Sequence, residues 1–101
     1  MSDQSEQPTV EVTHEPARQR WVARIDGEAV GAAYYDAADG LIVFTHTEVD
    51  DAHEGHGVGS ALARGALDDV RAEGTRRVIA RCPFIKGWID RHPDYQDLTR
   101  R

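Results

Sequence analysis

The chain has 101 residues, which is the length of one small domain. Its formal net charge of −6 argues against a general binder of nucleic acid or of anionic membranes. A single cysteine excludes a disulfide framework within the chain, and no apolar run reaches the length of about 18 residues that a membrane span needs. The first residues lack the basic and apolar stretches of a signal peptide. We therefore expect a cytoplasmic domain with neither a nucleic-acid nor a membrane partner.

The first half of the chain has the pattern of an antiparallel sheet. Residues 1–8 are polar and predict a disordered tail, and residues 9–101 predict one domain. Asp26-Gly27 between two runs of β-like residues is a strong hairpin signal, because both central residues of a type I′ turn take positive φ angles. Alternation of apolar and polar residues predicts strands over residues 9–14, 20–25, 28–35 and 41–47, with a turn at 36–40.

The second half predicts two helices that flank a fifth strand. Apolar residues spaced four apart indicate a helix over 58–73, and Gly74 suits its C-terminal end. A strand over 77–82, a short helix over 84–91 and a polar tail over 94–101 follow. The expected fold class is α/β (α+β), with an antiparallel-led mixed sheet of five strands, one long helix and a short C-terminal helix. The residues expected in the core include Trp21, Phe44, Leu62, Val70 and Ile79.

Three alternating glycines, Gly55, Gly57 and Gly59, come immediately before the long helix. A helix N-terminus has unpaired N–H groups that attract phosphate, and glycine lets the backbone approach an anion closely. The loop lacks the lysine of a Walker A motif, and it follows an antiparallel meander rather than the parallel unit of a dinucleotide-binding fold. A plain flexible loop is the alternative.

The segment 54–59, Glu-Gly-His-Gly-Val-Gly, resembles the pyrophosphate-binding loop of the GNAT acetyltransferase superfamily. The resemblance is closest to a small single-domain GNAT-like group, and it extends over residues 46–49, 54–69 and 82–95. Glu54 stands where the superfamily usually has Arg or Gln, so a carboxylate would lie near the anion. The resemblance implies a minimal GNAT-like fold and acetyl-CoA as the acetyl donor.

By this resemblance, backbone amides of the glycine loop hold the pyrophosphate, and the end of the fourth strand pairs with the pantetheine arm. Lys86, the only lysine, would meet a phosphate of the cofactor or would simply be solvated. The implied cofactor-binding residues are Thr47, Val49, Glu54, Gly55, His56, Gly57, Val58, Gly59, Ser60 and Lys86.

The resemblance also suggests candidates for catalysis. Glu48 would be the general base, with Asp50 and Asp51 behind it, unless these acids only solvate a loop. The superfamily usually places a tyrosine on the last helix as the acid for the leaving thiolate, but here Trp88 lies near that place. Tyr95 is the substitute we expect, with Tyr34 and Tyr35 as alternatives.

Cys82 is expected at the site, either as a small buried residue or, less favoured, as a nucleophile that forms an acetyl-cysteine. Four histidines invite a metal site, and two of them lie three residues apart, but in a flexible glycine loop without cysteine partners or a regular helix, so no metal site is predicted. They are His46, His53, His56 and His92.

The sequence thus predicts an N-acetyltransferase that acts by direct attack of an amine in a ternary complex. The amine is a small molecule or a protein amine, and the short chain implies an open acceptor site, with a homodimer as one way to complete it. A module that binds acyl-CoA without catalysis and an interaction domain without cofactor are the two alternatives.

Overall fold

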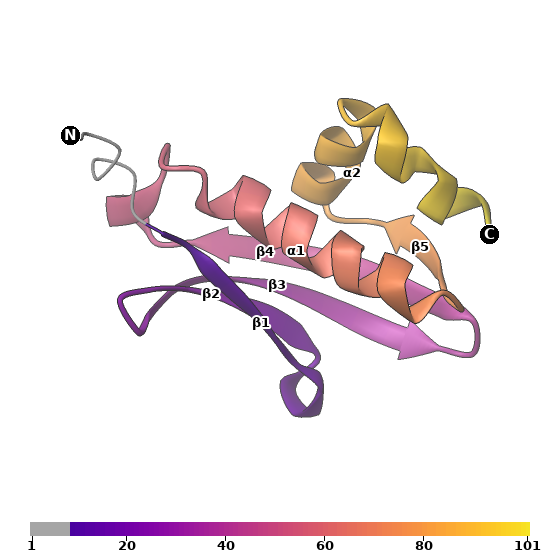
Figure 1. Ribbon diagram of the computed structural model, residues 1–101, viewed down its shortest axis with the longest axis horizontal. Coiled ribbons are helices and arrows are strands. Elements are labelled where there is room, and N and C mark those ends of the chain that lie inside the picture. The colour runs from indigo at the N-terminus through magenta and orange to yellow at the C-terminus, as the bar shows by residue number, and fades with distance from the viewer. Residues whose placement is uncertain (1–8) are drawn as a thin grey trace.

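The computed structural model describes residues 9–101, so the tail predicted for residues 1–8 lies outside the described residues. Five strands form one sheet in the order β1-β2-β3-β4-β5, with antiparallel neighbours except for the parallel pair β4 and β5. The strands are β1 (Glu11–Glu15), β2 (Arg20–Ile25), β3 (Glu28–Ala38), β4 (Leu41–Val49) and β5 (Arg77–Ala80). This arrangement confirms the expected fold class (Figure 1).

Two α-helices and three 3₁₀ helices complete the part of the domain that the structure describes. The α-helices are α1 (Val58–Glu73) and α2 (Pro83–Asp90), and the 3₁₀ helices are η2 (Pro16–Arg18), η3 (Asp51–His53) and η4 (Pro93–Arg100). In Figure 1, α1 runs across the sheet and α2 lies beside its first half. The apolar side chains of α1, α2 and η4 share one core with the sheet. Helices α1, α2 and η4 therefore lie on one face of the sheet, and within residues 9–101 neither α-helix covers the other face of β2, β3 and β4.

The core follows the predicted four-residue period of α1. Val58, Leu62, Ala66 and Val70 are all buried, as are Ala63 and Leu67 beside them. Gly65 lets the helix approach β1 closely, because a Cβ atom there would lie 2.9 Å from the side chain of Val12.

Several predicted boundaries were wrong. Strand β3 continues through residues 36–38, predicted as a turn, because they pair with β4 and leave only Asp39 and Gly40 to turn the chain. Strand β5 ends at Ala80 rather than at residue 82, because the N–H groups of Arg81 and Cys82 both donate to the carbonyl oxygen of Phe44, which ends the regular ladder.

Alternation along β5 places Val78 rather than Ile79 in the core, so the expectation for Ile79 was wrong.

The predicted polar tail over 94–101 is mostly helical. In η4, Tyr95 and Leu98 are buried against the helices, whereas the residues around them are polar and mostly exposed. Two anchoring side chains at this spacing are enough to dock a short helix that its composition alone does not predict.

Candidate functional site

The glycine loop and the first turn of α1 present backbone N–H groups to solvent. Gly55 and Gly57 have φ angles of +83° and +81°, the left-handed region that favours glycine. The first hydrogen bond of the helix runs from the N–H of Ala61 to the oxygen of Gly57, at 2.9 Å. The three N–H groups before it, those of residues 58–60, have no partner within the helix. This end of α1 therefore has the donors of an anion-binding site.

These groups line a cavity of about 410 Å³ at the N-terminal end of α1. Its lining includes all of the predicted cofactor residues except His56 and Lys86. The lining residues are Thr47, Val49, His53, Glu54, Gly55, Gly57, Val58, Gly59, Ser60 and Phe84. We call this cavity the loop pocket.

Strands β4 and β5 stop pairing at the edge of the loop pocket. Their last paired residues are Phe44 and Ala80. Further along β4, the N–H of Asp50 donates to the oxygen of Val30 on β3, at 2.8 Å. Because successive residues of a strand point their backbone groups to opposite edges, Thr47 and Val49 direct theirs to the edge that β5 has left open. An extended molecule can pair with β4 there as an added strand.

Cys82 lies at the N-cap position of α2, beside this opening. The thiol is buried, with 3% of the residue exposed, and its Sγ lies 3.2 Å from the Oγ1 of Thr47, which lines the loop pocket. The structure thus places Cys82 next to a lining residue of the loop pocket, with a polar contact rather than in a purely apolar setting.

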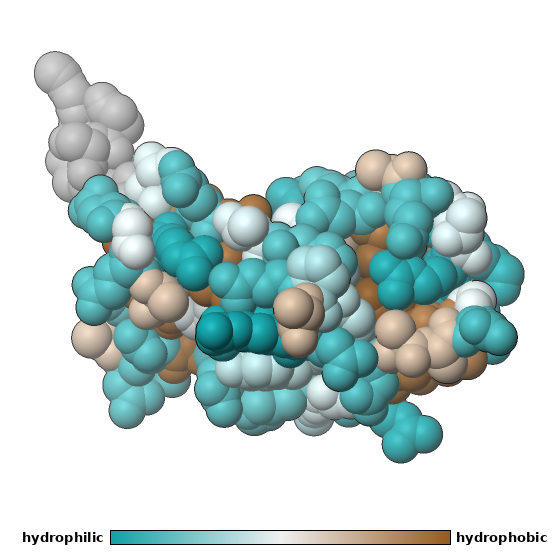
Figure 2. Space-filling view, turned by 90° about the horizontal axis from the view of Figure 1, so that it is seen from below, coloured by the Kyte–Doolittle hydropathy of each residue, from teal (hydrophilic) through white to brown (hydrophobic). Residues whose placement is uncertain are grey.

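Phe84 is a wall of the loop pocket that the sequence reasoning missed. It is 39% exposed and is the only large apolar residue among residues 9–101 that is exposed. Its ring lies over Gly59, where a Cβ atom would come within 2.7 Å of it. Hydrophilic residues dominate the face shown in Figure 2, so an exposed phenylalanine is not typical of the surface seen there. The signal available in the sequence was an aromatic residue directly after a helix-starting proline.

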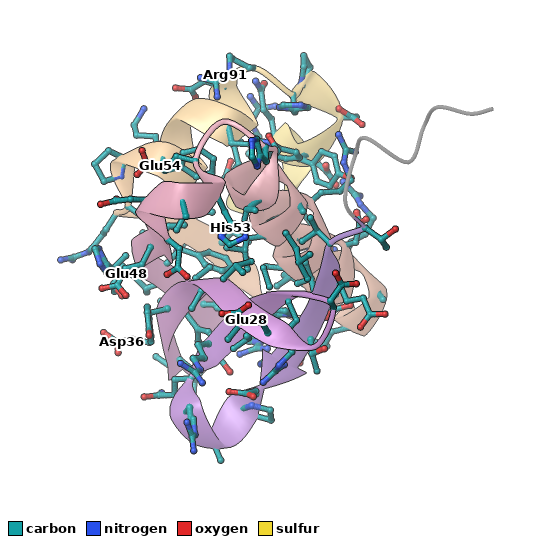
Figure 3. The ribbon with its side chains drawn as sticks, turned by 90° about the vertical axis from the view of Figure 1, so that its left-hand side faces the viewer. Glu28, Asp36, Glu48, His53, Glu54 and Arg91 are labelled. Carbon is teal, nitrogen blue, oxygen red and sulfur yellow. The ribbon has the colours of Figure 1, made fainter. Side chains whose placement is uncertain are left out.

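The sequence suggested no role for His53 other than that of a possible metal ligand. The structure places His53 in the lining of the loop pocket. Figure 3 shows it below the loop, between α1 and the sheet. Its Nδ1 atom is buried and has no hydrogen-bond partner among the described residues. Within residues 9–101, no group of three or more His, Cys, Asp or Glu side chains is arranged to hold a metal ion.

A second cavity, of about 670 Å³, lies on the face of the sheet opposite α1 and α2. Val22 and Ala32, both buried, form part of its lining, and Thr47, Val49 and Glu54 line both cavities. We call it the outer pocket. Its carboxylates are those of Glu48, Asp50, Asp51 and Glu54.

Glu48 faces the outer pocket because it lies opposite Ala32 in the sheet register. Its Oε2 lies 2.9 Å from Nε2 of His46, and both side chains are more than half exposed. In Figure 3, Glu48 and Glu54 lie on the same side of the molecule. The only Lys or Arg lining this pocket is Arg20, which already pairs with Glu15 at 2.8 Å, so the pocket has an excess of negative charge.

Three of the predicted site residues, His56, Lys86 and Tyr95, are absent from the lining of the loop pocket. Tyr95 packs against the far part of α1, where its hydroxyl donates to Asp68 at 2.7 Å. This hydrogen bond raises the pKa of Tyr95. Lys86 lies on another side of α2 from Phe84, where its Nζ pairs with Asp90 at 3.4 Å and it lines a groove beside β5. Trp88 is buried, and it too is absent from the lining.

Comparison with known proteins gives a consistent result. A family model described as GCN5-related N-acetyl-transferase matches residues 20–98. Protein NATD1 of Bos taurus is 30% identical over 93 residues, which cover 90% of this chain and 81% of that protein. Protein NATD1 of Homo sapiens is 29% identical with the same coverage.

A solution structure determined by NMR, of a GCN5-like protein from Staphylococcus aureus, has the same fold. It matches with a TM-score of 0.66 and 27% identity, over 87% of this chain and 85% of that one. Among residues 9–101, no helix is both long and apolar enough to cross a membrane. The family match covers most of the chain, and with it the loop pocket and the end of β4, so the chain belongs to the GCN5-related N-acetyltransferase family.

Proposed function

We propose that the protein is an acetyl-CoA-dependent N-acetyltransferase, in which the loop pocket binds the cofactor and the outer pocket binds the amine. The observation that carries this proposal is that the two cavities lie on opposite faces of β4 and share Thr47, Val49 and Glu54. Two reactants held on either side of one strand end can meet there, which a ternary complex requires.

The residues of the loop pocket fit coenzyme A in three respects. The N–H groups of residues 58–60 and the two left-handed glycines suit a pyrophosphate. The open edge of β4 at Thr47 and Val49 can pair with the amides of the pantetheine arm. The exposed ring of Phe84 gives that arm an apolar wall. When bound, acetyl-CoA would supply an acetyl group activated as a thioester.

Glu48 is our candidate general base. An amine that enters the outer pocket arrives as an ammonium ion and must lose a proton before its nitrogen can form the new bond to the acetyl carbon. The carboxylate of Glu48 is exposed to that pocket and can accept the proton directly or through water. The neighbouring carboxylates favour a positively charged acceptor, because they attract the ammonium form before it is deprotonated.

The leaving thiolate needs a proton, and the structure offers no tyrosine at the loop pocket for this purpose. Tyr95 is held by Asp68, away from the pocket. The thiol of Cys82 and the hydroxyl of Thr47, 3.2 Å apart beside the opening between β4 and β5, are candidate donors, and water can also reach the open pocket. We keep direct attack as the mechanism and an acetyl-cysteine at Cys82 as the competing route.

A module that binds acyl-CoA without transferring the acyl group is the second candidate. The absence of a tyrosine from the lining of the loop pocket favours it. The lone buried cysteine suits the reducing cytoplasm under either function. A second copy of the chain could cover the outer pocket, since α1, α2 and η4 all pack against the opposite face of the sheet.

Calorimetry with acetyl-CoA and an assay of free-thiol release over a panel of amines test the proposal together. We expect acetyl-CoA to bind and thiol release to depend on the amine, with di- and polyamines or lysine peptides ahead of neutral or acidic amines. Binding without release across the panel would favour the second candidate. No binding at high micromolar acetyl-CoA would refute both.

A further inference from the structure

The outer edge of β5 has no strand beside it among residues 9–101. Strand β5 is the last in the sheet order and pairs only with β4. The N–H of Arg77 donates to the carbonyl oxygen of Gly40, so the backbone groups of Arg77 point toward β4. Because successive residues of a strand direct these groups to opposite edges, Val78 and Ala80 direct theirs away from β4. They leave the N–H and C=O groups of an open sheet edge.

A cavity of about 360 Å³ follows this open edge. All four residues of β5 line it, and no residue of β4 does. Because neighbouring residues of a strand point their side chains to opposite faces, a single cavity that touches all four lies at the edge of the strand. Helices α2 and η4 supply three residues each to the rest of the lining, and both lie on the same side of β5 (Figure 1). We call this cavity the edge groove.

The edge groove is positively charged, although the chain has a net charge of −6. Arg77, Lys86 and Arg100 line it from three different elements, and all three residues are exposed. The only carboxylate among the described residues of its lining is that of Asp90, which pairs with Lys86 at 3.4 Å. The outer pocket has the opposite balance, with four carboxylates and one arginine. The edge groove therefore attracts a negatively charged ligand.

Apolar side chains line the edge groove as well. Ile79 of β5 is half-buried there, and Ile89 of α2 is buried. The groove thus offers three kinds of contact along a strand of four residues: backbone hydrogen bonds, positive charge and apolar surface. An extended peptide with both acidic and apolar side chains can use all three at once, because its side chains alternate about a backbone that pairs with the edge.

We propose that the edge groove binds an extended acidic segment of a partner protein, which adds to the sheet as a further strand beside β5. The N–H and C=O groups of Val78 and Ala80 would pair with the backbone of this segment. Its carboxylates would meet the charges of Arg77, Lys86 and Arg100. The edge groove shares no lining residue with the loop pocket or the outer pocket, so this inference does not depend on the proposed function.

Two other occupants fit the edge groove less well. A second copy of β5 would bring the cationic side chains of two edge grooves together, and like charges beside one another on paired strands are destabilising. The phosphodiester backbone of a nucleic acid carries acceptors without donors, so it would leave the C=O groups of the open edge unpaired. An acidic peptide has both the required charge and the required donors.

NMR titration of the isotope-labelled protein with a terminally blocked octapeptide of alternating glutamate and valine tests the proposal. We expect the largest shift changes at the amides of Val78 and Ala80. The matched octapeptide of alternating lysine and valine should bind at least about tenfold more weakly, because its charge opposes that of the groove. No binding of the acidic peptide, equal binding of the two peptides, or shift changes away from β5 would overturn the proposal.

N-methylation of the acidic octapeptide separates strand addition from charge attraction. In an extended peptide, the N–H groups of the glutamates face one edge and those of the valines face the other. Methylation of one of these two sets should therefore weaken binding by at least about tenfold, and methylation of the other set should have little effect. Equal losses, or no loss with either set, would refute strand addition.

Charge reversal on the protein tests the lining itself. Arg77→Glu and Arg100→Glu should each weaken binding of the acidic octapeptide by about tenfold or more. Arg18→Glu is the matched control, because Arg18 is exposed in η2 and does not line the edge groove, and its affinity should stay within about twofold of wild type. Equal losses in all three variants would overturn the assignment to the edge groove. Tighter binding of a single-stranded oligonucleotide than of the acidic peptide would overturn the choice of partner.

Discussion

The Oγ1 of Thr47 and the Sγ of Cys82 lie 3.2 Å apart, across the opening where β4 and β5 have ceased to pair. The contact joins the strand that lines the loop pocket to the first turn of α2, and it occupies the thiol with a hydrogen bond. Cys82 therefore links β4 to the start of α2, both under direct attack and under the covalent route.

Cys82→Ala separates direct attack from the covalent route. Under direct attack we expect kcat to stay within about threefold of wild type, because the substitution removes only a buried group beside the thioester. Intact mass spectrometry after incubation with acetyl-CoA alone should show no acetyl group on the wild-type protein. A loss of about a hundredfold in kcat together with an acetylated Cys82 would establish the covalent route instead.

Glu48→Gln should lower kcat by about 10²-fold or more, which is typical of a lost general base. The dissociation constant for acetyl-CoA should stay within about twofold, because Glu48 lines the outer pocket and is absent from the lining of the loop pocket. Asp51→Asn is the matched control, since it removes a carboxylate from the same outer pocket. Equal losses in the two variants would mean that Glu48 contributes only charge.

Gly57→Asp should weaken binding of coenzyme A by more than about tenfold, because it puts a carboxylate beside the proposed pyrophosphate position. Gly27→Asp is a close control, since Gly27 has nearly the same φ angle, +83° against +81°, and lies in the β2–β3 turn. Both variants carry the same backbone strain, so a difference in affinity measured by calorimetry reports the anion site. Unchanged affinity in Gly57→Asp would contradict the placement of the phosphates.

The parts of this site that the sequence predicted are those set by local backbone geometry. Glycines at residues 55, 57 and 59 before a regular helix specify the loop. The alternation of residues along β4 brings Thr47 and Val49 to the loop pocket, which Glu48 does not line. The positions of Lys86 and Tyr95 depend on how α2 and η4 rotate onto α1, and that rotation is fixed by buried contacts between segments far apart in sequence. The role of Phe84 was missed for the same reason.

Gly59→Ala should weaken the packing of Phe84, because the new Cβ would come within 2.7 Å of the ring. We expect a loss of about 1–2 kcal/mol in the free energy of unfolding, the usual cost of overpacking. Phe84→Ala should remove that clash, so the double variant should be more stable than the sum of the single effects implies. Additive effects in urea unfolding would show that the ring does not pack against Gly59 in solution.

His14 should make the stability of the fold depend on pH near neutrality. Burial lowers the pKa of His14 below its ordinary value of 6.5, more than the nearby carboxylate of Asp69 raises it. Its ring stacks on Trp21 at 4.0 Å, and its Nε2 lies 2.7 Å from the Tyr35 hydroxyl. A histidine whose pKa is lower in the folded state takes up its proton more readily in the unfolded state. Its contribution to the free energy of unfolding is therefore complete above the pKa of the unfolded state.

This contribution should be lost as the pH falls from about 7.5 through 6.5 toward the folded pKa, which would lower the urea midpoint. The carboxyl groups of Glu15 and Asp97, whose pKa values are lowered by their arginine partners, lose their contributions only at more acidic pH. His14→Gln should therefore be less stable at pH 7.5 and should show a flatter dependence between pH 7.5 and 5.5. A slope in His14→Gln identical to that of the wild-type protein would show that His14 is not the titrating group.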